Sequence, residues 1–126
     1  MCGINGYISN VIFPEQVISS MNEKIIHRGP DSDGVFHEKI GDNHIGLGMR
    51  RLSIIDLNNG DQPIFSEDKS LVIIYNGEIY NYLKLKKELI DDYNVDFKSN
   101  SDTEVILKMY EYHGVESFSR LDGMFA

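Results

Sequence analysis

The feature that most narrows the fold is a short continuous apolar run, LVIIYN at residues 71–76. Strands with one wet face alternate apolar and polar residues, whereas a continuous apolar run is typical of a strand buried on both faces. The chain has 126 residues, a length that suits one domain of roughly 100–150 residues with its own core. The run therefore predicts a layered domain with a covered strand near its centre.

The segments around this run mix two periodicities. CGINGYIS alternates and predicts a strand near residues 3–9, while Ile18, Met21 and Ile25 recur at helical spacing and predict a helix over 15–26. Further strands are expected at 34–40, 44–56 and 94–99 and at the final GMFA, and further helices at 79–91, from Ser101 onward and at 115–121. Ser101 and Glu104 match a capping box at the start of the helix expected from Ser101 onward. Strands mixed with helices indicate an α+β layered architecture.

Composition excludes several function classes. Twenty acidic and twelve basic residues give a net charge of −8, which argues against nucleic acid or an anionic membrane as the main partner. No apolar run approaches the roughly 20 residues that span a bilayer, and the first residues lack the pattern of a signal peptide. The single cysteine cannot form an internal disulfide, so a cytoplasmic location is expected. Because SRLDGMFA ends on an apolar step, we expect the natural polypeptide to continue.

The single cysteine, Cys2, stands directly after the initiator Met1. Once Met1 is removed, this residue carries both a thiol and a free α-amine, whose ordinary pKa values are about 8.5 and 7.7–8.0. The amine can then take the thiol proton, which is the arrangement of an N-terminal nucleophile. The alternative is a small buried hydrophobic residue that happens to come early.

The histidines give little support to metal or dyad chemistry. They stand at residues 27, 37, 44 and 113, at no metal-ligand spacing, and no second cysteine supports a zinc site. We therefore expect no metal. His27 borders a loop and is read as structural, although a Cys–His dyad stays open as an alternative.

Five motifs that occur in order along the chain favour the N-terminal nucleophile over a buried hydrophobic role for Cys2. They are CGINGYIS from Cys2, HRGPDSDG at 27–34, RLSIID at 51–56, NGEIYN at 76–81 and SDTEVIL at 101–107. Together they closely resemble the glutaminase domain of glutamine-hydrolysing asparagine synthetases, which are class II glutamine amidotransferases of the N-terminal nucleophile hydrolase superfamily. The resemblance covers the whole chain.

The resemblance implies a fold and a reaction. The family fold is a four-layer αββα sandwich of antiparallel sheets, of which residues 1–126 would form an incomplete glutaminase domain. The reaction is hydrolysis of L-glutamine to glutamate and ammonia without a cofactor. Ammonia would then pass to a C-terminal synthetase domain, absent here, which uses ATP and Mg²⁺ to convert aspartate to asparagine. The expected partners are glutamine and that domain, with self-association into a homodimer as a further option.

The resemblance also assigns the catalytic groups. Cys2 would form a γ-glutamyl thioester, and the Asn76 side chain with the Gly77 backbone N–H would stabilise the oxyanion. The position of these two residues is suitable, because the Asn-Gly pair follows an apolar strand and opens a turn. Taken alone, Asn-Gly is only a turn signal.

The remaining site residues would bind the amino-acid part of glutamine. Arg51 suits the α-carboxylate, because a guanidinium makes bidentate bonds to carboxylates. Glu78 and Asp102 match the residues that bind the α-ammonium, although an acid in a first helical turn is also favoured by the helix dipole. The pocket would be lined by the segment Leu52, Ser53, Ile54 and Ile55. Arg50 is interpreted as a solvated surface charge.

Two other interpretations stay open at this stage. A paralogue could donate ammonia to a different carboxylate acceptor, and a non-catalytic domain could keep the fold for binding or assembly. The HRGPDSDG segment is interpreted as scaffold or lid, with no part in the chemistry. A pyrophosphate-binding SGGxDS-type loop in a C-terminal half would favour the asparagine synthetase type.

Overall fold

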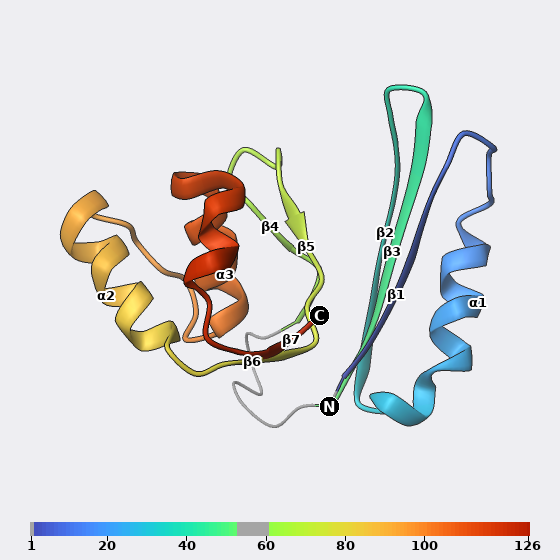
Figure 1. Cartoon of the computed structure of the whole chain (residues 1–126). Coiled ribbons are helices and arrows are strands. Elements are labelled where there is room, and N and C mark those ends of the chain that lie inside the picture. Colours follow the sequence, from blue (N-terminus) through green and yellow to red (C-terminus); the bar gives the residue numbers. More distant parts are fainter. Residues whose placement is uncertain (1, 53–60) are drawn as a thin grey trace.

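A computed structural model of the chain describes residues 2–52 and 61–126. Figure 1 shows two halves that are consecutive in sequence, a sheet with one helix and a second half dominated by two longer helices. All strand pairing in the described residues is antiparallel, which confirms the predicted mixed class with antiparallel sheets. No helix of the described residues has the length and apolar character needed to cross a membrane.

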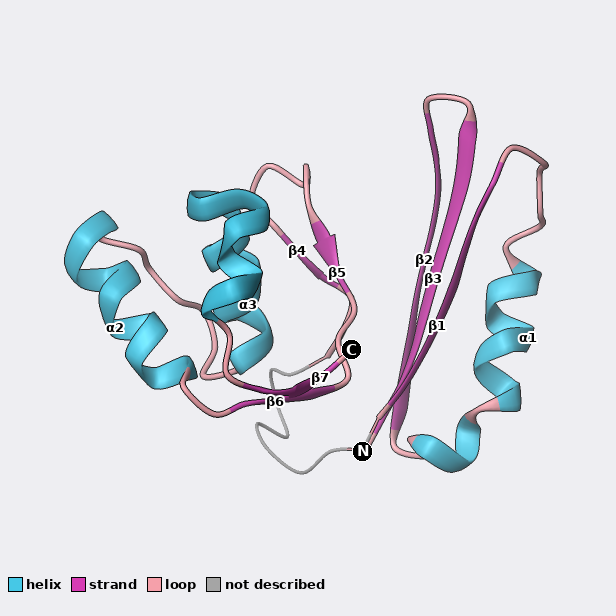
Figure 2. Cartoon of the chain, viewed as in Figure 1, coloured by secondary structure: helices cyan, strands magenta, loops and turns pink. Residues whose placement is uncertain are grey.

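The N-terminal half is a three-stranded sheet in the order β1-β3-β2 with a helix on one face (Figure 2). Its elements are β1 (Gly3–Ser9), α1 (Gln16–Lys24), the 3₁₀ turn η1 (Ile26–Arg28), β2 (Ser32–Ile40) and β3 (Asn43–Arg51). The predicted strand at 3–9 is confirmed, and the helix predicted at 15–26 ends at Lys24. Gly41 forms part of the β2–β3 turn at φ +61°, a conformation that favours glycine.

One buried amide ties the helix to all three strands. Asn22 of α1 is 2% exposed, and its Nδ2 donates to the carbonyl oxygens of Gly34 in β2 and Met49 in β3, at 3.1 and 3.2 Å. Its Oδ1 accepts a hydrogen bond of 2.7 Å from Asn5 in β1. A Cβ on Gly48 would lie 2.5 Å from that Oδ1, so the glycine leaves the space that the amide occupies.

The C-terminal half packs two helices against short strand pairs. Its elements are β4 (Ile64–Phe65), β5 (Val72–Ile73), β6 (Gly77–Ile79), α2 (Tyr82–Tyr93), α3 (Asp102–His113), the 3₁₀ helix η2 (Gly114–Arg120) and β7 (Gly123–Phe125). β4 pairs with β5 and β6 pairs with β7. The hydrophobic core of this half comprises Tyr75, Ile79, Leu85, Leu89, Val95, Val105, Ile106 and Met109.

Three strand predictions need correction. The apolar run at 71–76 forms a strand only at Val72–Ile73, and both residues are half-buried, because β4 is their one hydrogen-bonded neighbour among the described residues. Residues 94–99 form no strand, since the Glu104 carboxylate takes the backbone N–H groups of Lys98 and Ser99 at 2.9 and 2.8 Å. The strand predicted over 44–56 ends at Arg51, and residues 53–56 lie outside the described part.

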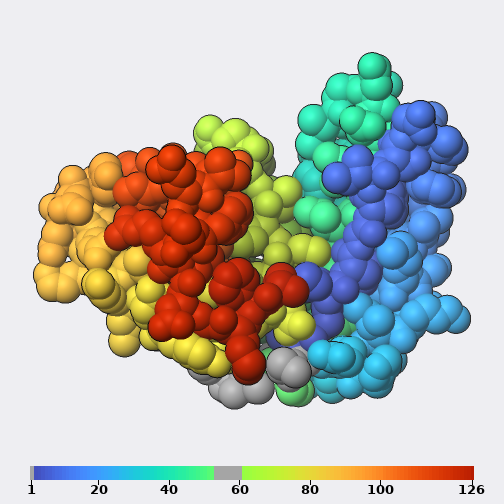
Figure 3. All heavy atoms as spheres, viewed as in Figure 1, coloured from blue at the N-terminus to red at the C-terminus, as the bar shows by residue number. Residues whose placement is uncertain are grey.

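The two halves meet around residues 61–65. A Cβ on Gly34 of β2 would lie 1.8 Å from the carbonyl oxygen of Gln62, so the backbones touch at that point. The Phe36 and Phe65 rings lie 5.9 Å apart between centroids and join the same contact. Figure 3 shows the halves in contact, with a notch at the far end of the β2–β3 hairpin.

Replacing Asn22 with leucine tests its role in the N-terminal sheet. Asn22→Leu keeps the side-chain size and leaves two backbone carbonyls and the Asn5 amide without a partner. We expect the free energy of unfolding to fall by about 3 kcal/mol, because each buried unsatisfied group costs about 1–3 kcal/mol. Urea unfolding measures the loss, and Ser19→Ala, at an exposed position of the same helix, should change it by less than about 0.5 kcal/mol. An equal effect of both variants contradicts the assignment.

Candidate active site

Cys2 lies at the end of the sheet where β1 and β3 meet. Gly3 pairs with Arg50, so the residue before Gly3 falls beside the end of β3. The half-buried Sγ of Cys2 accepts from the Leu52 N–H at 3.5 Å and lies 3.9 Å from the Leu52 carbonyl oxygen. A Cβ on Gly3 would lie 2.9 Å from the Ile25 side chain, so the chain passes close to the end of α1 directly after the thiol. The antiparallel pairing therefore places the predicted nucleophile against a predicted pocket residue.

Arg51 is the last residue of β3 and is 6% exposed. Its Nη1 donates to Asp61 Oδ1 at 3.0 Å, and the Asp61 side chain is 79% exposed. A buried guanidinium with an exposed carboxylate partner can exchange that partner for a ligand carboxylate. The other predicted pocket residues, Ser53, Ile54 and Ile55, lie outside the described residues.

Arg50 is not the solvated surface charge that the sequence suggested. It is 9% exposed, its Nε donates to the Gly29 carbonyl at 2.8 Å, and its Nη1 forms an ion pair of 3.3 Å with Asp33. A Cβ on Gly29 would lie 2.4 Å from the Arg50 carbonyl carbon, so the loop backbone lies directly on the strand. Arg50 thus fixes the HRGPDSDG segment to β3, which favours its interpretation as scaffold.

The pairing of β6 with β7 determines where the Asn76 and Gly77 groups point. Asn76 and Ala126 exchange two backbone hydrogen bonds of 2.9 Å. Hydrogen-bonded pairs alternate along an antiparallel ladder, so the next pair, Gly77 with Phe125, is not hydrogen-bonded and the Gly77 N–H faces away from β7. The buried Oδ1 of Asn76 has no hydrogen-bond partner in the described residues. Of the two donors predicted for the oxyanion, the Gly77 N–H is thus left outside the β6–β7 ladder.

Asp102 is the first residue of α3, directly after the Ser101 cap, whose Oγ accepts from the Thr103 N–H at 3.1 Å. The Asp102 Oδ2 accepts two hydrogen bonds of 3.0 Å, from the Tyr75 hydroxyl and from the Ile79 N–H. Ile79 is two residues beyond Gly77 on the same strand, so their N–H groups leave the same edge of β6. Asp102 thus lies along the edge to which Gly77 also points.

Glu78 differs from the other predicted acid. Its side chain is exposed, and no hydrogen bond or ion pair of its carboxylate is found among the described residues. The difference follows from strand alternation, because Glu78 points to the opposite face from the buried Ile79.

Gln62 lies between Arg51 and Asp102, two of the predicted site residues. The sequence did not indicate a role for Gln62. It follows Asp61, the partner of Arg51, and its Oε1 accepts from the Tyr75 N–H at 2.6 Å. Its Nε2 lies 3.5 Å from Thr103 Oγ1, one residue after Asp102. A run of contacts therefore links Arg51 to Asp102. In the described residues, no hydrogen bond joins Cys2 directly to Asn76 or Gly77.

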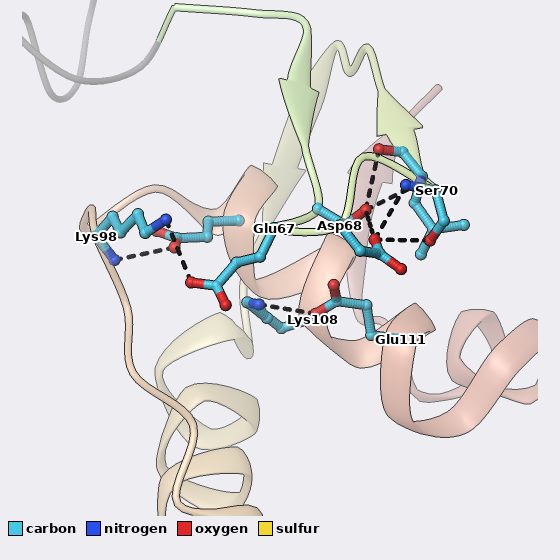
Figure 4. A network of polar contacts seen from close by, with 9 residues as sticks. Glu67, Asp68, Ser70, Lys98, Lys108 and Glu111 are labelled. Atoms are coloured by element: carbon cyan, nitrogen blue, oxygen red, sulfur yellow. Dashed lines mark hydrogen bonds and ion pairs between the residues drawn. The ribbon is translucent and has the colours of Figure 1, made fainter.

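A second polar cluster lies next to a cavity of about 350 Å³ beside β4 and α3 (Figure 4). Two ion pairs belong to it, Lys98 with Glu67 at 3.3 Å and Lys108 with Glu111 at 2.8 Å. The backbone N–H of Ser70, helped by nearby serine hydroxyls, lowers the pKa of Asp68 to about 2. The Asp68 contacts stabilise the turn after β4.

The thiol at the chain start, the buried arginine and the Asn-Gly strand agree with the comparison with known families. The chain belongs to the glutamine amidotransferase domain family, whose model matches residues 1–126. It is 48% identical over 131 residues to asparagine synthetase [glutamine-hydrolyzing] 1 of Bacillus subtilis, which covers the whole chain and 20% of that relative.

Similar proteins occur in other organisms as well. A putative asparagine synthetase [glutamine-hydrolyzing] 2 of Methanocaldococcus jannaschii is 41% identical over the whole chain and 27% of its own length. Asparagine synthetase [glutamine-hydrolyzing] 1 of Arabidopsis thaliana is 43% identical over 86% of the chain and 18% of its own length. The chain thus spans only 18 to 27% of the length of these curated relatives.

Replacing Gly77 tests whether the pairing of β6 with β7 requires a glycine opposite Phe125. A Cβ on Gly77 would lie 2.3 Å from the Met124 carbonyl oxygen and 2.5 Å from the Phe125 Cα, both backbone atoms. Gly77→Ala should therefore separate β6 from β7 and speed hydrogen exchange of the Asn76 N–H at least tenfold. Gly41→Ala is the control, because its Cβ meets nothing within 4 Å and its φ of +61° costs only about 1–2 kcal/mol. Unchanged exchange at Asn76 in Gly77→Ala contradicts the expected clash.

Proposed function

We propose that this domain hydrolyses L-glutamine to glutamate and ammonia, with Cys2 as the nucleophile. The observation that carries the proposal is the family match over residues 1–126, in a chain whose Cys2 thiol lies at the start of β1 against Leu52. An N-terminal thiol with its own α-amine needs no separate base. Removal of Met1 is a condition of the chemistry, because an acylated amine has no basicity.

The reaction proceeds in two balanced steps. The α-amine takes the thiol proton, the sulfur attacks the side-chain amide carbon of glutamine, and a tetrahedral intermediate forms. When the intermediate collapses, the C–N bond breaks and the protonated α-amine returns its proton to the leaving nitrogen. Ammonia is released, and a γ-glutamyl thioester remains on Cys2. Water then attacks the thioester, the C–S bond breaks, and glutamate and the free thiol result.

The oxyanion of the tetrahedral intermediate is stabilised by the Asn76 amide and the Gly77 backbone N–H. The orientation of the Gly77 N–H away from β7 supports this role. Donors fixed in advance cost no reorganisation during the reaction, and loss of one such donor slows turnover by about 10²–10³-fold.

The α-carboxylate and α-ammonium of glutamine bind opposite charges on the protein. Arg51 binds the carboxylate of glutamine, either after its ion pair with Asp61 opens or while that pair is kept. The backbone of residues 52–55 lines the pocket. Asp102, with Glu78 at the rim, takes the ammonium. Gly77 and Ile79 are two residues apart on a strand, about 6.8 Å, and the edge between them gives an extended glutamine room to reach both the oxyanion site and Asp102.

The proposal extends to the role of this domain in the full-length protein. In the full-length protein we expect this domain to complete a four-layer αββα sandwich and to supply ammonia to a synthetase domain. That domain would bind ATP and Mg²⁺ and convert aspartate to asparagine, as the names of the relatives suggest. A paralogue with another carboxylate acceptor is the alternative, and a pyrophosphate-binding loop with an aspartate pocket in the remaining chain distinguishes the two.

Replacing Cys2 tests the nucleophile. Cys2→Ala should abolish glutamate release from glutamine, because no other group of the site forms the thioester. Mass spectrometry of the N-terminus should show that active protein lacks Met1. A variant that cannot lose Met1 should be as inactive as Cys2→Ala, although its thiol is intact. Glutamate release by either protein contradicts the mechanism.

Replacing Arg51 tests carboxylate recognition. Arg51→Lys loses the bidentate geometry, so the KM for glutamine should rise about ten- to a hundredfold. The kcat/KM for 4-aminobutanamide, a glutamine analogue without the α-carboxylate, should change much less. Arg28→Lys, at an exposed position, is the matched control and should change neither substrate. An equal loss for both substrates would indicate a structural role for Arg51.

A further inference from the structure

We propose that Tyr75 is a positioning residue whose hydroxyl fixes the Asp102 carboxylate for the α-ammonium of glutamine. Tyr75 thereby determines how strongly the site rejects amides that lack an α-amino group. This inference rests on the proposed function, because it assigns a supporting residue to the same glutamine site.

Tyr75 is held at both ends. Its side chain belongs to the hydrophobic cluster of the C-terminal half, and the residue is 5% exposed. Its backbone N–H donates to Gln62 Oε1 at 2.6 Å, and its hydroxyl donates to Asp102 Oδ2 at 3.0 Å. A ring anchored in this way can hold a carboxylate in one orientation, because little freedom is left for the hydroxyl to lose.

The two oxygens of the Asp102 carboxylate are used differently. Oδ2 accepts from both Tyr75 and the Ile79 N–H, whereas Oδ1 accepts no hydrogen bond from the described residues. Both donors to Oδ2 are neutral, so they orient the group and leave its negative charge in place. The carboxylate therefore keeps one oxygen and a full charge for a cation.

The Tyr75 hydroxyl remains a donor over the working range of pH. Burial, followed by the negative charge of Asp102, raises the pKa of Tyr75 far above that of an ordinary tyrosine. The phenol thus stays protonated and cannot become a second anion beside Asp102.

A purely structural role for the hydroxyl is the competing explanation, and an analogue without the α-amino group separates the two. Glutaramate keeps the amide and the carboxylate of glutamine but lacks the ammonium that Asp102 would bind. Structural damage lowers kcat/KM for glutamine and glutaramate alike. Loss of the fixed orientation of the Asp102 carboxylate lowers kcat/KM for glutamine alone.

The experiment measures glutamate or glutarate release by the full-length natural protein and its Tyr75→Phe variant. We expect the KM for glutamine to rise about tenfold, the scale of one hydrogen bond to a charged group, with kcat within about twofold. The kcat/KM for glutaramate should stay within about twofold. Tyr82→Phe is the matched control, since Tyr82 packs against the same cluster, and it should leave both substrates unchanged.

Asp102→Asn separates the failure of this inference from the failure of the proposed site. If Asp102→Asn removes the preference for glutamine over glutaramate and Tyr75→Phe does not weaken it, the role of Tyr75 is overturned while the ammonium site stands. If Asp102→Asn leaves the preference intact, the ammonium site itself is wrong and the role of Tyr75 falls with it. In the double variant, Tyr75→Phe should add no further loss, and an additive loss also overturns the inference.

Discussion

The antiparallel register of β6 with β7 governs the direction of every polar backbone group between residues 76 and 80. Asn76 and Tyr80 bond across the ladder, which turns the N–H groups of Gly77 and Ile79 to the opposite edge. The Asp102 carboxylate occupies the Ile79 end of that edge and joins the strand to α3. A shift of one residue would exchange the two sets of groups, so the candidate site depends on this pairing.

Local signals in the sequence predicted many of the elements. Alternation at 3–9, helical spacing after Pro14 and the Ser101 cap each depend on neighbours in the chain, and each corresponds to an observed element. The predictions failed where a distant partner decides the structure. The strand at 71–76 is short because its pairing with β4 extends over only two residues.

The candidate site shows the same division. Motif order identified the family, and the residues it assigned are half-buried or buried, apart from the exposed Glu78 and those outside the described part. The supporting residues escaped because their contacts are non-local. Tyr75 and Asp102 are 27 positions apart, and Arg50 meets the Gly29 carbonyl 21 positions away. In the sequence Tyr75 is only the apolar neighbour of Asn76, and Arg50 only one of two adjacent cations.

The amide of Asn22 has a consequence for folding fidelity. Its two acceptors, the Gly34 and Met49 carbonyls, belong to residues that lie directly opposite each other in the β2–β3 register. A slip of one residue would move one carbonyl by about 3.4 Å and reverse the faces of the strand. Helix α1 therefore helps to specify the register of the β2–β3 hairpin, because only the correct alignment offers both carbonyl acceptors to the Asn22 side chain. Hydrophobic packing alone, being non-directional, distinguishes alignments less sharply.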